Sequence, residues 1–102
     1  MTQVTHNIIE QIISIPYGKV VSYGDIAKRA GLSNGARQVV RVLHMMTEKY
    51  NLPWHRVIRS DGKIALQGDD RDLQIAILYA EGVKVSVTGR VNKEFFMKWE
   101  SF

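Results

Sequence analysis

The 102-residue sequence contains no cysteine. Without a thiol, the chain cannot form a disulfide, bind a metal through thiolates or use a cysteine as a nucleophile. The three histidines lie far apart, at positions 6, 44 and 55, and no glycine-rich phosphate-binding loop or Gly-x-Ser-x-Gly motif occurs. The usual signatures of metal-dependent and nucleophilic enzymes are therefore absent, and we expect a protein without a cofactor.

Long apolar runs are missing as well. No stretch approaches the roughly 20 apolar residues of a membrane span, and the first residues lack the charged and apolar regions of a signal peptide. There is no repeat, low-complexity stretch or linker that would divide the chain. We expect a single domain over residues 1–102, monomeric, cytoplasmic and without membrane contact.

Positive charge is in excess. Fourteen Lys and Arg against ten Asp and Glu give a formal net charge of +4. This sign favours a polyanionic partner, and nucleic acid is the leading candidate.

The apolar spacing predicts a mainly α-helical fold. A first helix with an isoleucine face ends near residue 14, before Pro16. Ser22-Tyr23-Gly24-Asp25 has the spacing of a capping box and predicts a short second helix that ends at Gly31. Ser33 is expected to cap a third helix over about 34–47. Two helices joined around a glycine are a helix-turn-helix candidate.

The second half of the chain adds a small predicted β-hairpin, with strands at 56–58 and 63–66 around Asp61-Gly62. A hairpin beside a helix-turn-helix is typical of a winged helix-like DNA-binding domain. Asp69 or Asp70 is expected to cap a last helix that ends at Gly82. The helix should bury Leu73, Ala76, Ile77 and Ala80, and the core should be covered by Phe95, Phe96 and Trp99.

The most informative segment is Leu52-Pro53-Trp54-His55-Arg56-Val57-Ile58, where a loop tryptophan stands beside histidine and arginine. Its Pro53-Trp54-His55-Arg56-Val57 resembles the Pro-Cys-His-Arg-Val signature of the O6-alkylguanine-DNA alkyltransferase family, with Trp54 at the active cysteine. Similar segments follow the family's order: Ile15-Pro16-Tyr17-Gly18, Val21-Ser22-Tyr23, Ala36-Arg37-Gln38-Val39 and Glu81-Gly82. With cysteine replaced, the chain resembles the alkyltransferase-like proteins, which bind such lesions without removing the alkyl group.

The resemblance implies residues that bind DNA and flip a base. Tyr23 would press on the phosphate beside the target nucleotide and help to rotate it outward. Arg37 would enter from the minor groove and fill the space that the flipped base leaves. Ser22 and Gln38 lie in the same matching segments and complete the expected set with Arg41, for which a phosphate contact and a merely solvated position both stay open.

The resemblance also implies a lesion pocket. Trp54 would give the O6-alkyl group an apolar wall, and an indole is too poor a nucleophile to accept the alkyl group. The expected lining is completed by Pro53, Arg56, Tyr23, Gln67 and Gly68.

Three further positions differ from the transferases in role or in residue. His55 and Glu81 match the pair that activates the cysteine through a water, so here they form a vestigial relay, which we expect to be structural. Met46 stands where an asparagine usually precedes the cysteine by eight residues and braces the hinge.

The leading hypothesis is a non-enzymatic DNA damage sensor. It would flip O6-alkylguanine out of double-stranded DNA and flag the site for nucleotide excision repair proteins. One alternative is a winged-helix protein that reads duplex sequence, such as a small transcription regulator. The other is an enzyme that transfers the alkyl group to another side chain.

Overall fold

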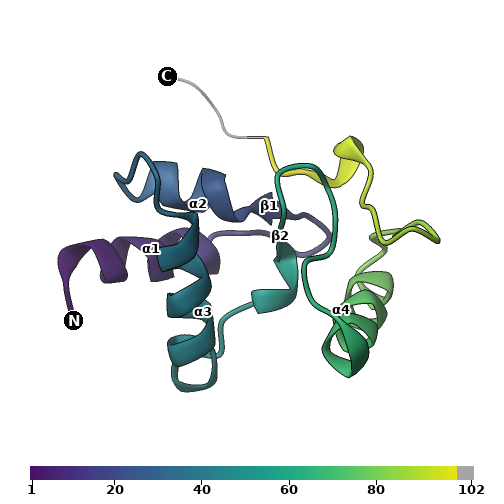
Figure 1. Ribbon diagram of the computed structural model, residues 1–102, viewed down its shortest axis with the longest axis horizontal. Helices are drawn as coiled ribbons and strands as arrows, with labels where there is room; N and C mark the ends of the chain where they lie inside the picture. The colour runs from purple at the N-terminus through teal and green to yellow at the C-terminus, as the bar shows by residue number, and fades with distance from the viewer. Residues whose placement is uncertain (99–102) are drawn as a thin grey trace.

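The structure is a computed structural model, and it describes residues 1–98 (Figure 1). The predicted place of Trp99 in the core lies outside these residues. The described elements, in chain order, are α1 Gln3–Ile13, β1 Val21–Ser22, α2 Tyr23–Arg29, α3 Ala36–Tyr50, the 3-10 helix η1 Trp54–Arg56, β2 Val57–Ile58, α4 Gly68–Ala80 and the 3-10 helix η2 Lys93–Phe95.

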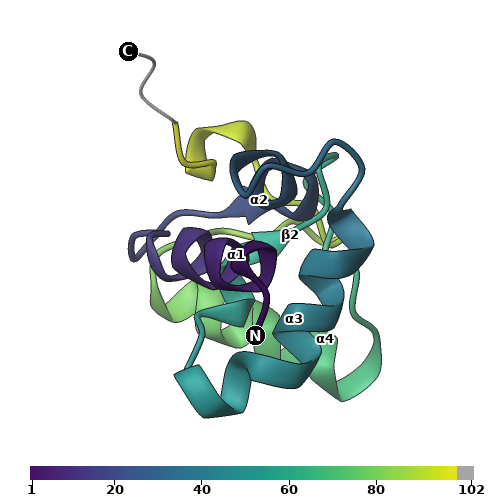
Figure 2. The ribbon, with the colours of Figure 1, turned by 90° about the vertical axis from the view of Figure 1, so that its left-hand side faces the viewer.

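Helices α1, α2 and α3 pack around one apolar core, away from α4 (Figures 1 and 2). The isoleucine face of α1 supplies Ile8, Ile9 and Ile12, which are buried against residues of α2 and α3. The helix ends at Ile13, before Pro16, as the sequence predicts. Burial of this face removes a large apolar area from water, which is the main force that holds the three helices together.

Helices α2 and α3 form the predicted helix-turn-helix. The Ser22 hydroxyl accepts a hydrogen bond from the Asp25 N–H at 3.1 Å, so the predicted cap is confirmed. The predicted Ser33 cap is wrong, because α3 begins at Ala36 and its N-cap is Gly35. Gly35 lies so close to Leu32 that a Cβ there would be 2.5 Å from the Leu32 Cδ1 atom. The tight turn between the helices therefore requires glycine.

The predicted hairpin is wrong. Strand β2 pairs in parallel with β1, with Val21 opposite Val57 and Ser22 opposite Ile58. After a tight turn at Gly62, the chain instead pairs with a C-terminal segment: Ile64 N–H donates to the Gly89 carbonyl at 2.9 Å. The local pattern could not indicate this, because both partners of the true pairing lie far away in sequence.

Helix α4 closes a second apolar cluster, formed by Val20, Ile58, Ile64, Leu78, Val83 and Val91. Phe95 and Phe96 are half-buried against this cluster, as predicted. Gly82 follows the helix with φ of +84°, the left-handed conformation that the sequence predicts there. The second cluster thus ties the end of the chain to β2 and α4.

Two predictions about α4 are wrong. The helix begins at Gly68 after Gln67, so Asp69 and Asp70 lie in its first turn, where the helix dipole favours negative charge, and do not cap it. Its buried positions are Gln74 and Leu78, whereas Leu73 is 51% exposed. Ala76 and Ala80 are exposed as well, and Ile77 is half-buried. The buried face of the helix therefore differs from the predicted one, and on it Gln74 donates to the His55 carbonyl at 3.1 Å.

Within residues 1–98, no helix is long and apolar enough to cross a membrane. The same residues contain no cluster of three or more histidine, aspartate or glutamate side chains that could hold a metal ion.

Candidate nucleic-acid interface

A pocket of about 310 Å³ lies between the helix-turn-helix and α4. We call it the Tyr23–Trp54 pocket. The helix-turn-helix and η1 contribute Tyr23, Val40, Leu43, His44, Thr47 and Trp54, and the opposite wall consists of Leu66, Asp70 and Gln74. The pocket therefore combines aromatic and aliphatic walls with a few polar groups, which is the usual composition of a ligand site.

Tyr23 is the first residue of α2 and is half-buried. Burial raises the pKa of its phenol above the ordinary value of 10.0, so the hydroxyl keeps its proton at neutral pH. Ser22 sets this position, since its hydroxyl caps α2 one residue earlier. Ser22 itself is 3% exposed and caps α2 from inside the fold; its contact with DNA stays a prediction.

Trp54 opens η1 and separates two pockets. Its indole lies edge-on to the His55 ring, with ring centroids 6.1 Å apart. Trp54 also lines the second pocket, which has a volume of about 670 Å³ and includes Pro53, His55 and Arg56 in its lining. Trp54 is thus the residue of the signature segment that faces the Tyr23–Trp54 pocket, together with the helix residues named above.

The structure divides the predicted lesion pocket. Tyr23 and Trp54 line the Tyr23–Trp54 pocket, as the prediction requires. Pro53 and Arg56 line the second pocket instead, because the chain turns through η1 after Pro53. Gln67 and Gly68 are exposed at the start of α4 and line neither pocket.

Gln74 is a pocket residue that the sequence analysis missed. Its side chain is 1% exposed, and its Nε2 atom donates to the His55 carbonyl at 3.1 Å and to the Val57 carbonyl at 3.4 Å. The sequence held one signal of this role: a glutamine stands between the apolar residues of α4. A buried amide must bond something, so such a position predicts a specific polar contact.

The two residues that follow Trp54, His55 and Arg56, contact Glu81. Together with Gly18 they form a dense polar cluster, which we call the Glu81 cluster. The Glu81 carboxylate lies 2.6 Å from His55 Nε2 and accepts hydrogen bonds from Arg56 at 2.9 to 3.2 Å. It also accepts from the Gly18 N–H at 2.9 Å. Tyr17 closes the cluster, with its hydroxyl bonded to the Ala80 carbonyl and its ring 5.7 Å from the Arg56 guanidinium.

These contacts determine the charge of Glu81. Burial by itself raises the pKa of this carboxyl, but the hydrogen bonds from Arg56, the Gly18 N–H and His55 outweigh it and lower the pKa from 4.5 to about 2. The carboxylate is therefore ionised at neutral pH and has all its bonds to groups of the fold. The Glu81 cluster is bonded within the fold, and the structural role of His55 and Glu81 stays a prediction.

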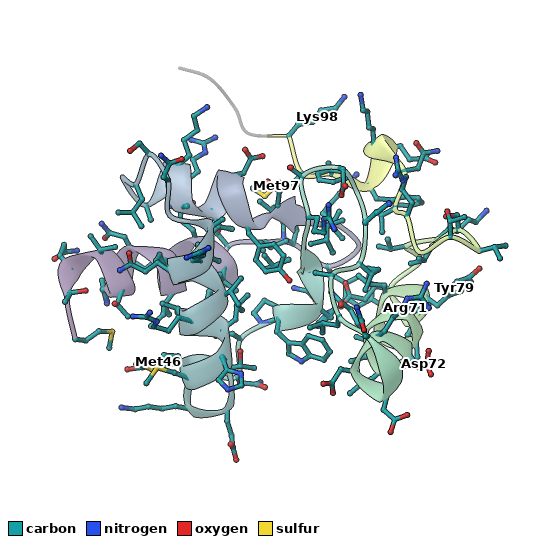
Figure 3. The ribbon with its side chains drawn as sticks, in the orientation of Figure 1. Met46, Arg71, Asp72, Tyr79, Met97 and Lys98 are labelled. Atoms are coloured by element: carbon teal, nitrogen blue, oxygen red, sulfur yellow. The ribbon has the colours of Figure 1, made fainter. Side chains whose placement is uncertain are left out.

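The basic side chains of α3 lie on its outer surface. Arg37, Gln38 and Arg41 are all exposed, in the second helix of the helix-turn-helix, and Lys28 is exposed on the first. Among residues 1–98, Arg37 and Arg41 form no ion pair. Met46 lies farther along α3 (Figure 3), half-buried against the core that α1, α2 and α3 share.

Comparison with known proteins decides the family. The family described as 6-O-methylguanine DNA methyltransferase, DNA binding domain, matches residues 3–83. The chain belongs to this family. Among its relatives, the DNA base-flipping protein of Vibrio parahaemolyticus is 45% identical over 98% of this chain and 99% of its own. Alkyltransferase-like protein 1 of Schizosaccharomyces pombe is 38% identical over 79% of this chain and 77% of its own.

A solved structure of the family agrees with this assignment. S. pombe Atl1, in complex with damaged DNA containing O6-carboxymethylguanine, matches with a TM-score of 0.80 and 31% identity over 96% of this chain and 97% of the other. The likeness confirms two predictions from the sequence: the mainly α fold with a helix-turn-helix DNA-binding domain, and the resemblance to alkyltransferase-like proteins.

Proposed function

We propose that the protein is a non-enzymatic sensor of alkylated guanine in DNA. It binds duplex DNA through α2 and α3, flips O6-alkylguanine into the Tyr23–Trp54 pocket and marks the site for nucleotide excision repair. The observation that carries the proposal is the position of Trp54: the residue that replaces the family's cysteine lines the same pocket as Tyr23.

The pocket suits a flipped base in size and chemistry. Its volume of about 310 Å³ is at the lower end of the range of small-ligand sites. Trp54, Val40 and Leu43 offer apolar surface for a ring and an alkyl group. Stacking or contact between a base and an aromatic side chain contributes about 1 to 3 kcal/mol, which is comparable to the few kcal/mol that flipping a weakened pair requires.

The outer surface of the helix-turn-helix suits the phosphate backbone. Arg37, Arg41 and Lys28 are exposed on α2 and α3, on a chain with a net charge of +4. Neutralised phosphates release counterions, so binding should weaken steeply with salt. Exposed Arg37 is free to leave the surface and enter the space that a flipped base vacates.

Catalysis has no nucleophile in this arrangement. The sequence has no cysteine, and the indole of Trp54 is a poor nucleophile at neutral pH. The His55–Glu81 pair is engaged by Arg56 and Gly18, so its hydrogen bonds serve the fold. Binding is thus the whole proposed activity.

The test compares matched duplexes that differ only in one base, guanine or O6-methylguanine, at a fixed salt concentration. We expect the lesion duplex to bind at least about tenfold more tightly, since its pair with cytosine is weaker and the pocket receives the methyl group. Intact-mass measurement after incubation should show no added methyl group. Equal affinity for both duplexes would contradict the sensor, and a gain of one methyl mass would show an alkyl acceptor.

The link to excision repair needs its own test. Incision of a lesion duplex by purified excision repair proteins should increase when the protein is present, and incision of the unmodified duplex should stay unchanged. A decrease of incision at the lesion would show that the protein shields the damage.

A further inference from the structure

The Tyr23–Trp54 pocket contains a buried acceptor without a partner. The Oε1 atom of Gln74 has no hydrogen bond within residues 1–98, although the side chain is 1% exposed and lines the pocket. A buried polar atom without a partner is unfavourable by roughly 1 to 3 kcal/mol. Such a group persists in a fold where a ligand satisfies it.

The orientation of the Gln74 amide is fixed by its neighbours. Its other terminal atom, Nε2, donates to the carbonyl oxygens of His55 and Val57. An amide turned the other way would place its oxygen against two oxygens, which is repulsive. The unpaired atom is therefore the oxygen, and it requires a ligand with an N–H or O–H donor.

O6-alkylguanine has one such donor on the edge that a flipped base presents. Alkylation of O6 removes the proton from N1, so the 2-amino group is the remaining donor of the Watson–Crick edge. Proteins read flipped bases by hydrogen bonds to this edge. We propose that Gln74 Oε1 accepts a hydrogen bond from the 2-amino group of the flipped base, an inference that rests on the proposed function.

The backbone turn at η1 positions both Trp54 and Gln74, the two residues proposed to contact the base. Gln74 bonds the carbonyls of His55 and Val57, and Trp54 immediately precedes His55 on η1. The alkyl group would contact Trp54 while the amino group contacts Gln74, so one rigid turn sets the distance between them. Oε1 has almost no exposed surface, so the base reaches it after the side chains that cover it have moved.

The experiment varies the amino group and the glutamine together. Affinities are measured for three duplexes with guanine, O6-methylguanine or O6-methylhypoxanthine opposite cytosine; the last base lacks only the 2-amino group of the lesion. The wild type is compared with Gln74→Lys, which retains a donor for the two carbonyls and has no acceptor, and with Gln74→Met, which has neither.

For each protein we compare the affinity for the O6-methylguanine duplex with that for the O6-methylhypoxanthine duplex. We expect this ratio of affinities to be about tenfold higher for the wild type than for either variant. Loss of the amino group also weakens the pair with cytosine, but it does so equally for every protein. The added charge of lysine strengthens binding to every duplex equally. Both effects therefore cancel when the ratios are compared. Asp72→Asn is the matched control: it changes an exposed residue of the same helix that lines neither pocket, and it should keep the wild-type dependence on the amino group.

The outcomes separate the two proposals. If the wild type prefers O6-methylguanine to guanine but the variants keep its dependence on the amino group, the role of Gln74 is refuted and the sensor stands. If the wild type shows no preference for O6-methylguanine over guanine, both proposals fail. If a variant does not fold, the wild type is titrated with single strands that carry O6-methylguanine or O6-methylhypoxanthine, in which there is no pair with cytosine to weaken. Equal affinity for these two strands also refutes the contact.

Discussion

The Glu81 cluster and the Tyr23–Trp54 pocket both include residues of η1, but they differ in whether their polar groups have hydrogen-bond partners. In the cluster, Glu81 accepts hydrogen bonds from Arg56, His55 and the Gly18 N–H. In the pocket, the Tyr23 hydroxyl and Gln74 Oε1 have no hydrogen-bond partner among residues 1–98. Satisfied groups stabilise a fold, and unsatisfied ones are free to bind a ligand. Two consecutive residues of η1 differ in this way: Trp54 lines the pocket, and His55 belongs to the hydrogen-bonded cluster.

The Glu81 carboxylate is fixed by a guanidinium and by a backbone N–H, each at 2.9 Å. In a chain without cysteine, these bonds serve the junction of α1, η1 and α4, since Arg56 also donates to the Ile15 carbonyl.

The largest expected effect breaks the cluster. Glu81→Gln leaves the Arg56 guanidinium, 16% exposed, without its counter-charge. Loss of one partner of a buried pair lowers the free energy of unfolding by about 3 to 5 kcal/mol, so the melting temperature should fall by at least about 12 °C. Thermal unfolding measures this, with the exposed Glu94→Gln as control. At a temperature where the variant is folded, its preference for the lesion should persist; a stable variant that loses this preference would place Glu81 in the site.

Acid should have a slightly smaller effect on the same cluster. Because the pKa of Glu81 is lowered from 4.5 to about 2 in the folded protein, ionisation favours the folded state at every pH above 4.5. This contribution, about 3 kcal/mol, disappears as the pH falls from 4.5 to 2. Urea unfolding across this window should therefore show a loss of stability in the wild type that is largely missing in Glu81→Gln. Parallel pH profiles for the two proteins would refute the assignment.

On the pocket side, Trp54→Ala should leave stability nearly unchanged and weaken lesion binding. Trp54 is half-exposed, so its removal opens no large internal cavity. Loss of an aromatic contact with a base should reduce the affinity for the O6-methylguanine duplex by about 2 kcal/mol, roughly 30-fold. Fluorescence anisotropy measures this, and Trp54→Phe, which keeps an aromatic ring, should retain most of the affinity. A large loss of stability without loss of lesion preference would assign Trp54 to the fold.

Helices α1 and α2 could be predicted well from the sequence, and the residues of the pocket only in part. Isoleucine spacing and the Ser22 capping box depend on neighbours within a few residues, so α1 and α2 follow from the local pattern. The parallel pairing of β1 with β2, and Gln74 in the pocket wall, depend on segments far apart in sequence. A family signature places Trp54 at the site but does not state which way its neighbours face, and Pro53 and Arg56 face the second pocket.

The smallest expected effects compare two arginines on the outer surface of α3. Arg37→Ala should weaken binding to the lesion duplex by about tenfold and reduce its preference over guanine, since a planar cation suits the space left by a flipped base. Arg41→Ala should weaken binding to both duplexes equally, by about threefold, and lower the salt slope by about one, as expected for one lost phosphate contact.

The two arginines are matched controls for each other, because both are exposed, lie one helical turn apart and have the same charge. Any effect of charge alone must therefore appear in both variants. If only Arg37→Ala loses the preference for the lesion, the two arginines have different roles. Arg37 then stabilises the state with the flipped base, and Arg41 binds any duplex. Equal effects of the two substitutions on both duplexes would assign Arg37 to the phosphates, and the vacated space would need another residue to fill it.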